Sequence, residues 1–131
     1  SGEGDLLLVV TADMGLAGAF NAEILKLAEQ ELKKLNVKRL VTVGVKAESY
    51  FKKHGVELSA FSHFYDTPDL DEAAIIVDDI MDAMEANNLG GLSMVYSNFK
   101  TPLAQVPKVV NILPLKPFEE RRTISTILSL T

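Results

Sequence analysis

Residues 11–21, which read TADMGLAGAFN, lie where a nucleotide-binding loop would lie but lack part of what such a loop needs. They follow an unbroken apolar run, residues 6–10, and open an amphipathic segment. The dinucleotide fingerprint G-x-G-x-x-G uses its glycines to turn the chain tightly beside a pyrophosphate. When the two patterns are aligned, the second and third glycines fall on Gly15 and Gly18, but the first falls on Asp13.

Two departures from this fingerprint argue against dinucleotide binding. A carboxylate at Asp13 repels the anion that the loop would hold. The fingerprint also requires an acidic residue about 20 positions further on, where residues 43–46 read VGVK and contain no acid. A small-molecule or nucleotide-binding domain is therefore kept as the alternative interpretation. A phosphoacceptor domain is a third, although it needs an acidic pair after the first strand and Asp13 stands alone.

Four carboxylates between residues 78 and 85 have the spacing of a metal site on one helix, namely Asp78, Asp79, Asp82 and Glu85. Hard cations need oxygen ligands from several directions, which one helix face does not provide. Burial of each large apolar side chain is worth about 1.5–3 kcal/mol, so the apolar stripe of this helix decides which face turns inward. The sequence therefore predicts a solvated acidic face and no metal.

The remaining reactive residue types form no recognised catalytic pattern. His54 and His63 are interpreted as a cap or as packing residues, and there is no cysteine nucleophile, hydrolase elbow, zinc motif or P-loop. In the aromatic and basic run 50–54, we expect Tyr50 or Phe51 to pack on a sheet while the lysines remain solvated. The sequence thus predicts no catalytic residue and no cofactor.

Composition is that of an ordinary single globular domain. The chain has 131 residues, of which 47% are hydrophobic and 24% charged, and it contains no cysteine. Its net charge of −5 argues against nucleic-acid binding, which requires a basic surface. No apolar run reaches the length of a membrane span, and no signal pattern is present.

The elements that must position these residues alternate between strand and helix. Apolar runs predict strands at 6–10, 39–43, 56–64, 92–96 and 108–115, and helical periodicity predicts helices from about 18 to 36, 46 to 54 and 67 to 86. Thr67 and Pro68 suit the start of the third helix. The last connection is too short for a crossover, which favours an antiparallel return. We predict an α/β Rossmann-like three-layer domain with strand order 3-2-1-4-5 and an antiparallel fifth edge strand.

The domain is expected to comprise residues 1–131, with a core at about 5–115 and a tail at 116–131. The tail begins with charged residues and continues with four apolar residues among serines and threonines: Ile124, Ile127, Leu128 and Leu130. Three alternatives remain open for it. It is an extra strand, a docked segment, or the beginning of something truncated.

Residues 11–21 also resemble the strand-end signature of the ATP synthase gamma subunit, which usually reads SDRGLCGAFN. The shared positions are Asp13, Gly15, Leu16, Gly18, Ala19, Phe20 and Asn21. Further similar features follow in the family's order: VTVG at 41–44, an acidic helix from Pro68, MVY at 94–96 and ILPL at 112–115. The resemblance covers about residues 5–115.

The chain departs from this family in three respects. Met14 replaces the usual arginine and Ala17 the usual cysteine. The tail after Lys116 does not resemble the family's next segment. No apolar heptads run over three or four repeats, so we expect an excised globular domain without the coiled-coil terminal helices that form the shaft.

The resemblance implies a non-catalytic rotor domain in the central stalk of a proton-driven ATP synthase. It implies docking to the epsilon subunit and to the ring of c subunits, and to the alpha and beta hexamer through the shaft, with catalytic sites on those other subunits. In a bacterium it implies a peripheral location at the cytoplasmic face of the cell membrane.

Within that resemblance, the motif residues are expected to serve the fold. Gly15 and Gly18 would permit a tight turn, Asp13 would cap the following helix, and Phe20 would anchor that helix on the sheet. For Leu16 and Asn21, packing and capping are favoured over contact with a partner.

Overall fold

A computed structural model describes residues 4–12, 18–61, 70–97, 107–112 and 117–130. Within these ranges five strands form one sheet: β1 (Asp5–Val10), β2 (Val37–Val43), β3 (Glu57–Phe61), β4 (Gly91–Ser97) and β5 (Pro107–Ile112). The same ranges contain four helices: α1 (Gly18–Lys34), α2 (Val45–Phe51), α3 (Leu70–Ala86) and α4 (Pro117–Leu130).

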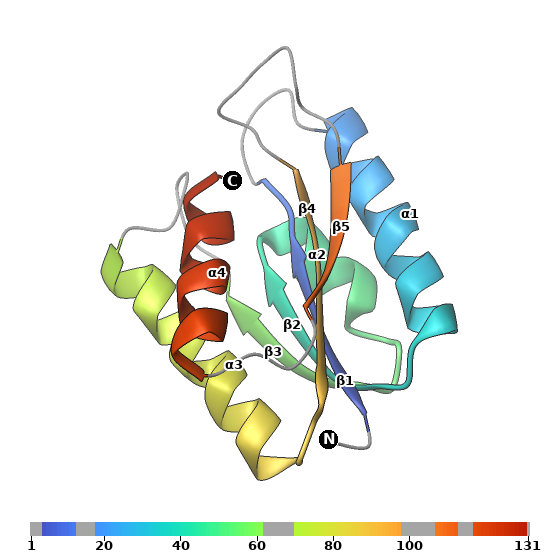
Figure 1. Ribbon diagram of the computed structural model, residues 1–131. Coiled ribbons are helices and arrows are strands. Elements are labelled where there is room, and N and C mark those ends of the chain that lie inside the picture. The colour runs from blue at the N-terminus through green and yellow to red at the C-terminus, as the bar shows by residue number, and fades with distance from the viewer. Residues whose placement is uncertain (1–3, 13–17, 62–69, 98–106, 113–116, 131) are drawn as a thin grey trace.

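The strand order is β3-β2-β1-β4-β5, as predicted from the sequence. β1 pairs in parallel with β2 and β4, β2 pairs in parallel with β3, and β4 pairs antiparallel with β5. At the centre, Leu8 lies level with Val41 on one side and Met94 on the other. The predicted three-layer α/β architecture with an antiparallel edge is confirmed, and Figure 1 shows the helices covering the sheet on both sides.

The central strand β1 is apolar on both faces because helices cover both. Its alternate residues enter two separate cores. Leu6 and Leu8 pack in the core under α3 and α4, whereas Leu7 and Val9 pack in the core under α1 and α2, and these side chains are fully buried. At about 1.5–3 kcal/mol for each buried large apolar side chain, these two cores are the main stabilising contribution to the domain.

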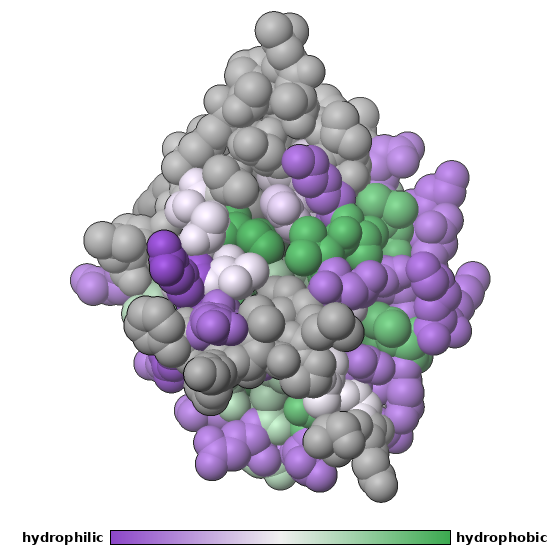
Figure 2. All heavy atoms as spheres, viewed as in Figure 1, coloured by the Kyte–Doolittle hydropathy of each residue, from purple (hydrophilic) through white to green (hydrophobic). Residues whose placement is uncertain are grey.

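Solvent-facing surfaces follow the amphipathic patterns of the helices. In α1, Ile24 and Ala28 are buried, and Lys33 and Lys34 lie in the last turn, where they complement the helix dipole. Figure 2 shows hydrophilic side chains over the outer surface of α1, with hydrophobic ones gathered along the line where α1 meets β5. The proposed start of the third helix at Thr67 and Pro68 lies outside the described residues.

The tail folds as helix α4, which lies alongside α3 (Figure 1). Of the three alternatives left open by the sequence, it is a docked segment. Ile124, Ile127 and Leu128 recur at helical spacing and are buried in the core shared with α3. Arg121 Nη1 lies 2.7 Å from Asp78 Oδ1 and ties the two helices at their surface. The core of the domain therefore extends beyond the predicted limit at residue 115.

Candidate functional site

The motif that the sequence singled out is described only in part. Asp13, Gly15 and Leu16 lie outside the described residues. Gly18 and Phe20 belong to the first turn of α1, where the backbone alone is described. The expected roles of these five residues therefore stay predictions.

Asn21 is fully described and holds the turn between β1 and α1. Its Oδ1 accepts a hydrogen bond from the backbone N–H of Ala12 at 3.0 Å, and its Nδ2 donates to the carbonyl oxygen of Ala12 at 2.7 Å. One carboxamide thus satisfies both polar groups of one peptide residue nine positions away. Because Asn21 is only 6% exposed, its observed contacts are those of a residue that supports the fold.

Thr11, the first residue of the motif, caps a helix that lies far along the chain. The N-cap position of α2 is Gly44, which has no side chain and a φ of 105°. The Thr11 hydroxyl lies 3.2 Å from the backbone nitrogen of Ala47 and accepts its N–H. Ala47 is at the position where an N-cap side chain normally bonds. Thr11 thus takes over the capping role, and its own N–H donates to Val43 O at 2.9 Å.

The acidic residues of α3 are mostly solvated, as predicted. Asp78, Asp82 and Glu85 are exposed, and Asp78 pairs with Arg121. Among the residues that the structure describes, no three ligating side chains gather in a way that holds a metal ion. Asp79 differs from its neighbours, since it is partly buried and faces the interior of the domain.

His54 forms part of a surface cluster that links α2 to α1. Its Nε2 lies 2.6 Å from Glu29 Oε1, and its ring stacks on that of Tyr50 with the ring centroids 5.7 Å apart. Partial burial, the hydrogen bond to Glu29 and the charge of that carboxylate raise the pKa of Tyr50 above its usual value. Phe51 is buried, and Lys52 and Lys53 are exposed, as predicted. His63 lies outside the described residues.

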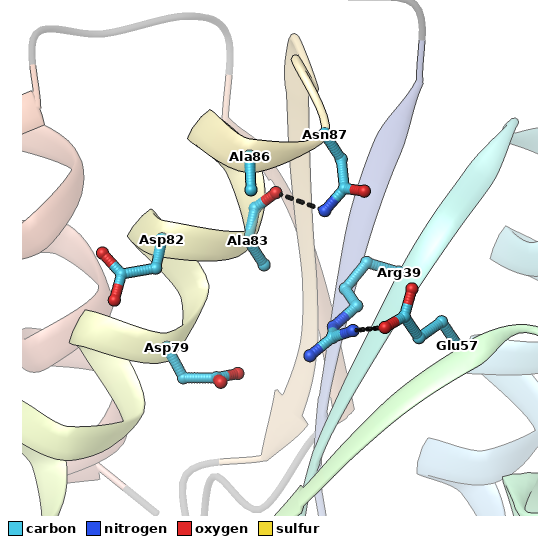
Figure 3. Close-up of a pocket in the computed structure, with 7 residues that line it drawn as sticks. All are labelled: Arg39, Glu57, Asp79, Asp82, Ala83, Ala86 and Asn87. Carbon is cyan, nitrogen blue, oxygen red and sulfur yellow. Dashed lines mark hydrogen bonds and ion pairs between the residues drawn. The ribbon is translucent and has the colours of Figure 1, made fainter.

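A polar hollow that sequence reasoning missed lies between the second half of α3 and the first residues of β2 and β3 (Figure 3). Its volume is about 370 Å³, and seven residues line it: Arg39, Glu57, Asp79, Asp82, Ala83, Ala86 and Asn87. A lone arginine in a short strand, followed 40 positions later by an acidic helix, is the one signal that the sequence offers. Nothing in their spacing indicates that they meet.

The fold and the turn after β1 define a class of protein, a Rossmann-like α/β domain. In that turn, the side chains of Thr11 and Asn21 bond to the backbone of the domain itself. The sequence profile of the ATP synthase family matches residues 2–129. The ATP synthase gamma chain of Desulforamulus reducens is 32% identical over 117 residues, which cover 88% of this chain and 41% of that one. That of Cutibacterium acnes is 33% identical over 125 residues, covering 89% and 40%.

Solved structures agree on the fold. The central stalk and c-ring structure of the Tetrahymena thermophila mitochondrial ATP synthase contains a chain that superposes with a TM-score of 0.70 at 17% identity. The match covers 98% of this chain and 66% of that chain. A rotor structure of the Euglena gracilis mitochondrial ATP synthase gives a TM-score of 0.59 at 20% identity, covering 93% and 42%.

The chain therefore belongs to the ATP synthase family, and within it to the gamma chains. It spans about two fifths of the length of the gamma chains it matches. The profile match extends to residue 129, so the expectation that the tail after Lys116 departs from the family is wrong. The regular pattern of Ile124, Ile127 and Leu128 was masked by the serines and threonines between them.

Proposed function

We propose that this chain is the globular rotor domain of a proton-driven ATP synthase, where it transmits rotation and docks other subunits of the central stalk. The observation that carries the proposal is the match of the ATP synthase profile to nearly the whole chain, residues 2–129. In this proposal the domain is not catalytic by itself, and the catalytic sites lie on other subunits.

The architecture suits a part that must transmit force without deforming. The sheet is packed on both faces by helices, and the central strand β1 has five consecutive residues that are almost fully buried. Close-packed interiors have low compressibility and transmit strain. A torque applied to such a block moves it as one body.

The partners proposed for this domain are the epsilon subunit and the c ring, with the alpha and beta hexamer reached through a coiled-coil shaft. Within the described residues, no helix combines the length and the apolar character needed to cross a bilayer. For a bacterial chain, we propose that the domain is held at the cytoplasmic face of the cell membrane by the assembly to which it belongs.

The decisive experiment is binding to the epsilon subunit of the same organism. We expect the two proteins, mixed at tens of micromolar, to elute together in size-exclusion chromatography with a mass equal to the sum of the two. Separate elution at these concentrations would contradict the docking role. Leu8→Asp, which places a carboxylate in the core, serves as the unfolded control that must not bind.

The alternative, a nucleotide-binding domain, is not favoured by the family match, and it has its own test. Thermal unfolding with millimolar ATP, ADP or NAD is expected to show no saturable stabilisation. A saturable rise in Tm that disappears in a folded Gly15 or Gly18 variant would restore the alternative and overturn the non-catalytic interpretation.

A further inference from the structure

Helix α4 is built largely from residues that form helices poorly. It has 14 residues, and isolated helices of about this length are marginal in water even when they consist of good helix formers. In the run 123–129, which reads TISTILS, six of the seven residues are β-branched or serine. Such side chains lose rotamer freedom in a helix or favour caps and turns. The helical state of α4 therefore depends on its contacts with the rest of the domain.

Three hydroxyl groups of α4 bond within the helix and do not attach it to other elements. Thr123 Oγ1 donates to the carbonyl oxygen of Glu119 at 2.9 Å, and Thr126 Oγ1 donates to that of Arg122, also at 2.9 Å. Ser129 Oγ donates to the carbonyl oxygen of Thr126 at 2.6 Å. A side-chain bond to the carbonyl four positions back slightly destabilises a helix. These bonds therefore do not compensate for the weak helix formers.

The contacts that attach α4 to the domain are mainly apolar. Ile124, Ile127 and Leu128 are buried in the core under α3 and α4. At the surface, Arg121 Nη1 lies 2.7 Å from Asp78 Oδ1, but the two side chains are 46% and 59% exposed. An ion pair as exposed as this one contributes little to stability. The described attachment of α4 thus depends chiefly on three apolar side chains.

The contact between α3 and α4 is also incomplete. A cleft of about 320 Å³ is lined by residues of both helices, namely Ala74, Val77, Arg121, Arg122 and Ser125. The small side chains of Ala74 and Ser125 leave this part of the contact unfilled. Few apolar contacts and a solvent-exposed contact surface are features of segments that open locally.

Helix α1 differs from α4 in each of these respects. Its residues 22–34, which read AEILKLAEQELKK, are almost all strong helix formers. The Asn21 side chain bonds its first turn to Ala12, and Glu29 bonds to His54 beyond α2. The two helices are therefore expected to differ in the free energy at which they open.

We propose that α4 is a detachable strap. Residues 117–130 leave α3 and lose their helical structure as one unit while the sheet and α1 stay folded, and they refold on α3 in the same way. The open state uncovers the part of the core that Ile124, Ile127 and Leu128 fill. The domain thus has a conformational switch that operates below the free energy of global unfolding. The inference concerns the conformations of this chain alone and is independent of the rotor proposal.

Native-state hydrogen exchange of the 131-residue chain tests this proposal. The backbone amides of α4 and of β1 are followed by NMR at several low urea concentrations. We expect the amides of residues 121–129 to share one protection level that is at least about tenfold lower than that of residues 6–10. Their protection should also depend less on urea, because opening of α4 exposes less surface than global unfolding does.

Two variants separate local opening from global unfolding. Ile24→Val weakens the core on the opposite face of the sheet, so the protection of the β1 amides should fall about fivefold, whereas that of the α4 amides should not change. Thr126→Ala, at an exposed position, should raise the protection of the α4 amides about threefold, because alanine is the better helix former. Gln30→Ala, at an exposed position of α1, is the matched control and should leave the α4 amides unchanged.

Three results would overturn the proposal. The first is a single protection level and a single urea dependence for the amides of α4 and β1. The second is an equal loss of protection in both elements of Ile24→Val. The third is a loss of α4 protection in Thr126→Ala, because the helix would then be stabilised by its own hydroxyl bonds.

Discussion

The turn after β1 and the hollow beneath α3 are polar regions at two ends of the same sheet. The polar groups of the turn are hydrogen-bonded, whereas two buried polar atoms of the hollow have no described partner. In the turn, Asn21 makes two hydrogen bonds to Ala12, and Thr11 caps α2. In the hollow, Asp79 Oδ2 and Arg39 Nε have no partner among the described residues. The first region lies after the carboxyl end of β1, and the second lies by the amino ends of β2 and β3.

This difference reverses the usual expectation for the fold. Open α/β sheets commonly bind their ligands beyond the carboxyl ends of the strands. Here the described side chains at the carboxyl end of β1 bond to the backbone of the same chain, so they contribute to stability. The buried polar atoms without a partner among the described residues, Asp79 Oδ2 and Arg39 Nε, lie at the opposite end, where β2 and β3 begin.

Loss of the Asn21 carboxamide is the largest effect that this comparison predicts. In Asn21→Ala, the N–H and the C=O of Ala12 both lose their partners in a partly buried turn. The expected loss is about 2–4 kcal/mol in the free energy of unfolding, measured by urea denaturation. Asn21→Asp should recover only part of it, because a carboxylate accepts from the N–H but repels the carbonyl oxygen.

Gln30→Ala on the exposed side of α1 is the control for this variant. It removes a carboxamide from the same helix without breaking a contact of the turn, so its stability should change by less than about 0.5 kcal/mol. If Asn21→Ala were as stable as Gln30→Ala, the turn would not depend on its internal bonds and the comparison would be wrong.

Removal of the Thr11 hydroxyl tests the hydrogen bond by which the turn caps α2. Thr11→Val keeps the shape but leaves the N–H of Ala47 without its acceptor. We expect a loss of about 1 kcal/mol, the usual cost of losing an N-cap side chain. Thr11→Ser should retain most of the capping contribution. A loss in Thr11→Ser with no loss in Thr11→Val would mean that packing of the γ-methyl group, and not capping, is what the site requires.

Removal of a polar side chain from the hollow should raise the free energy of unfolding, whereas removal from the turn lowers it. Asp79→Ala removes a buried acceptor atom, Oδ2, that has no hydrogen-bond partner among the described residues, so we expect the chain to gain about 1 kcal/mol in the free energy of unfolding. Asp82→Ala, three positions along the same helix and exposed, measures the gain from helix propensity alone. The prediction requires Asp79→Ala to exceed this control, and a net loss of stability would show that Asp79 already has a partner.

The architecture was predictable from local patterns, and so was a role in the fold for Asn21, but the backbone partner of Asn21 and the polar hollow beneath α3 were not. Runs such as residues 6–10 and 92–96 identify buried strands, and the short connection before β5 indicates its antiparallel direction. Helix α4 was left open because serine and threonine, which favour caps and turns, separate its apolar residues. The meeting of Arg39 with Asp79 depends on how α3 crosses the sheet, and no local pattern contains that crossing.

The smallest predicted effect concerns the surface cluster of Tyr50, His54 and Glu29, where the fold does supply partners. Because the pKa of Tyr50 is raised above 10.0 by partial burial and by Glu29, the native chain holds this proton more tightly than the unfolded chain does. Stability should therefore fall as pH rises from 10 toward the native pKa. The difference in phenolate absorbance between the natural chain and Tyr50→Phe gives the midpoint directly. Glu29→Gln should lower that midpoint but not restore it fully, since burial is the larger cause, and a midpoint at or below 10 would contradict the assignment.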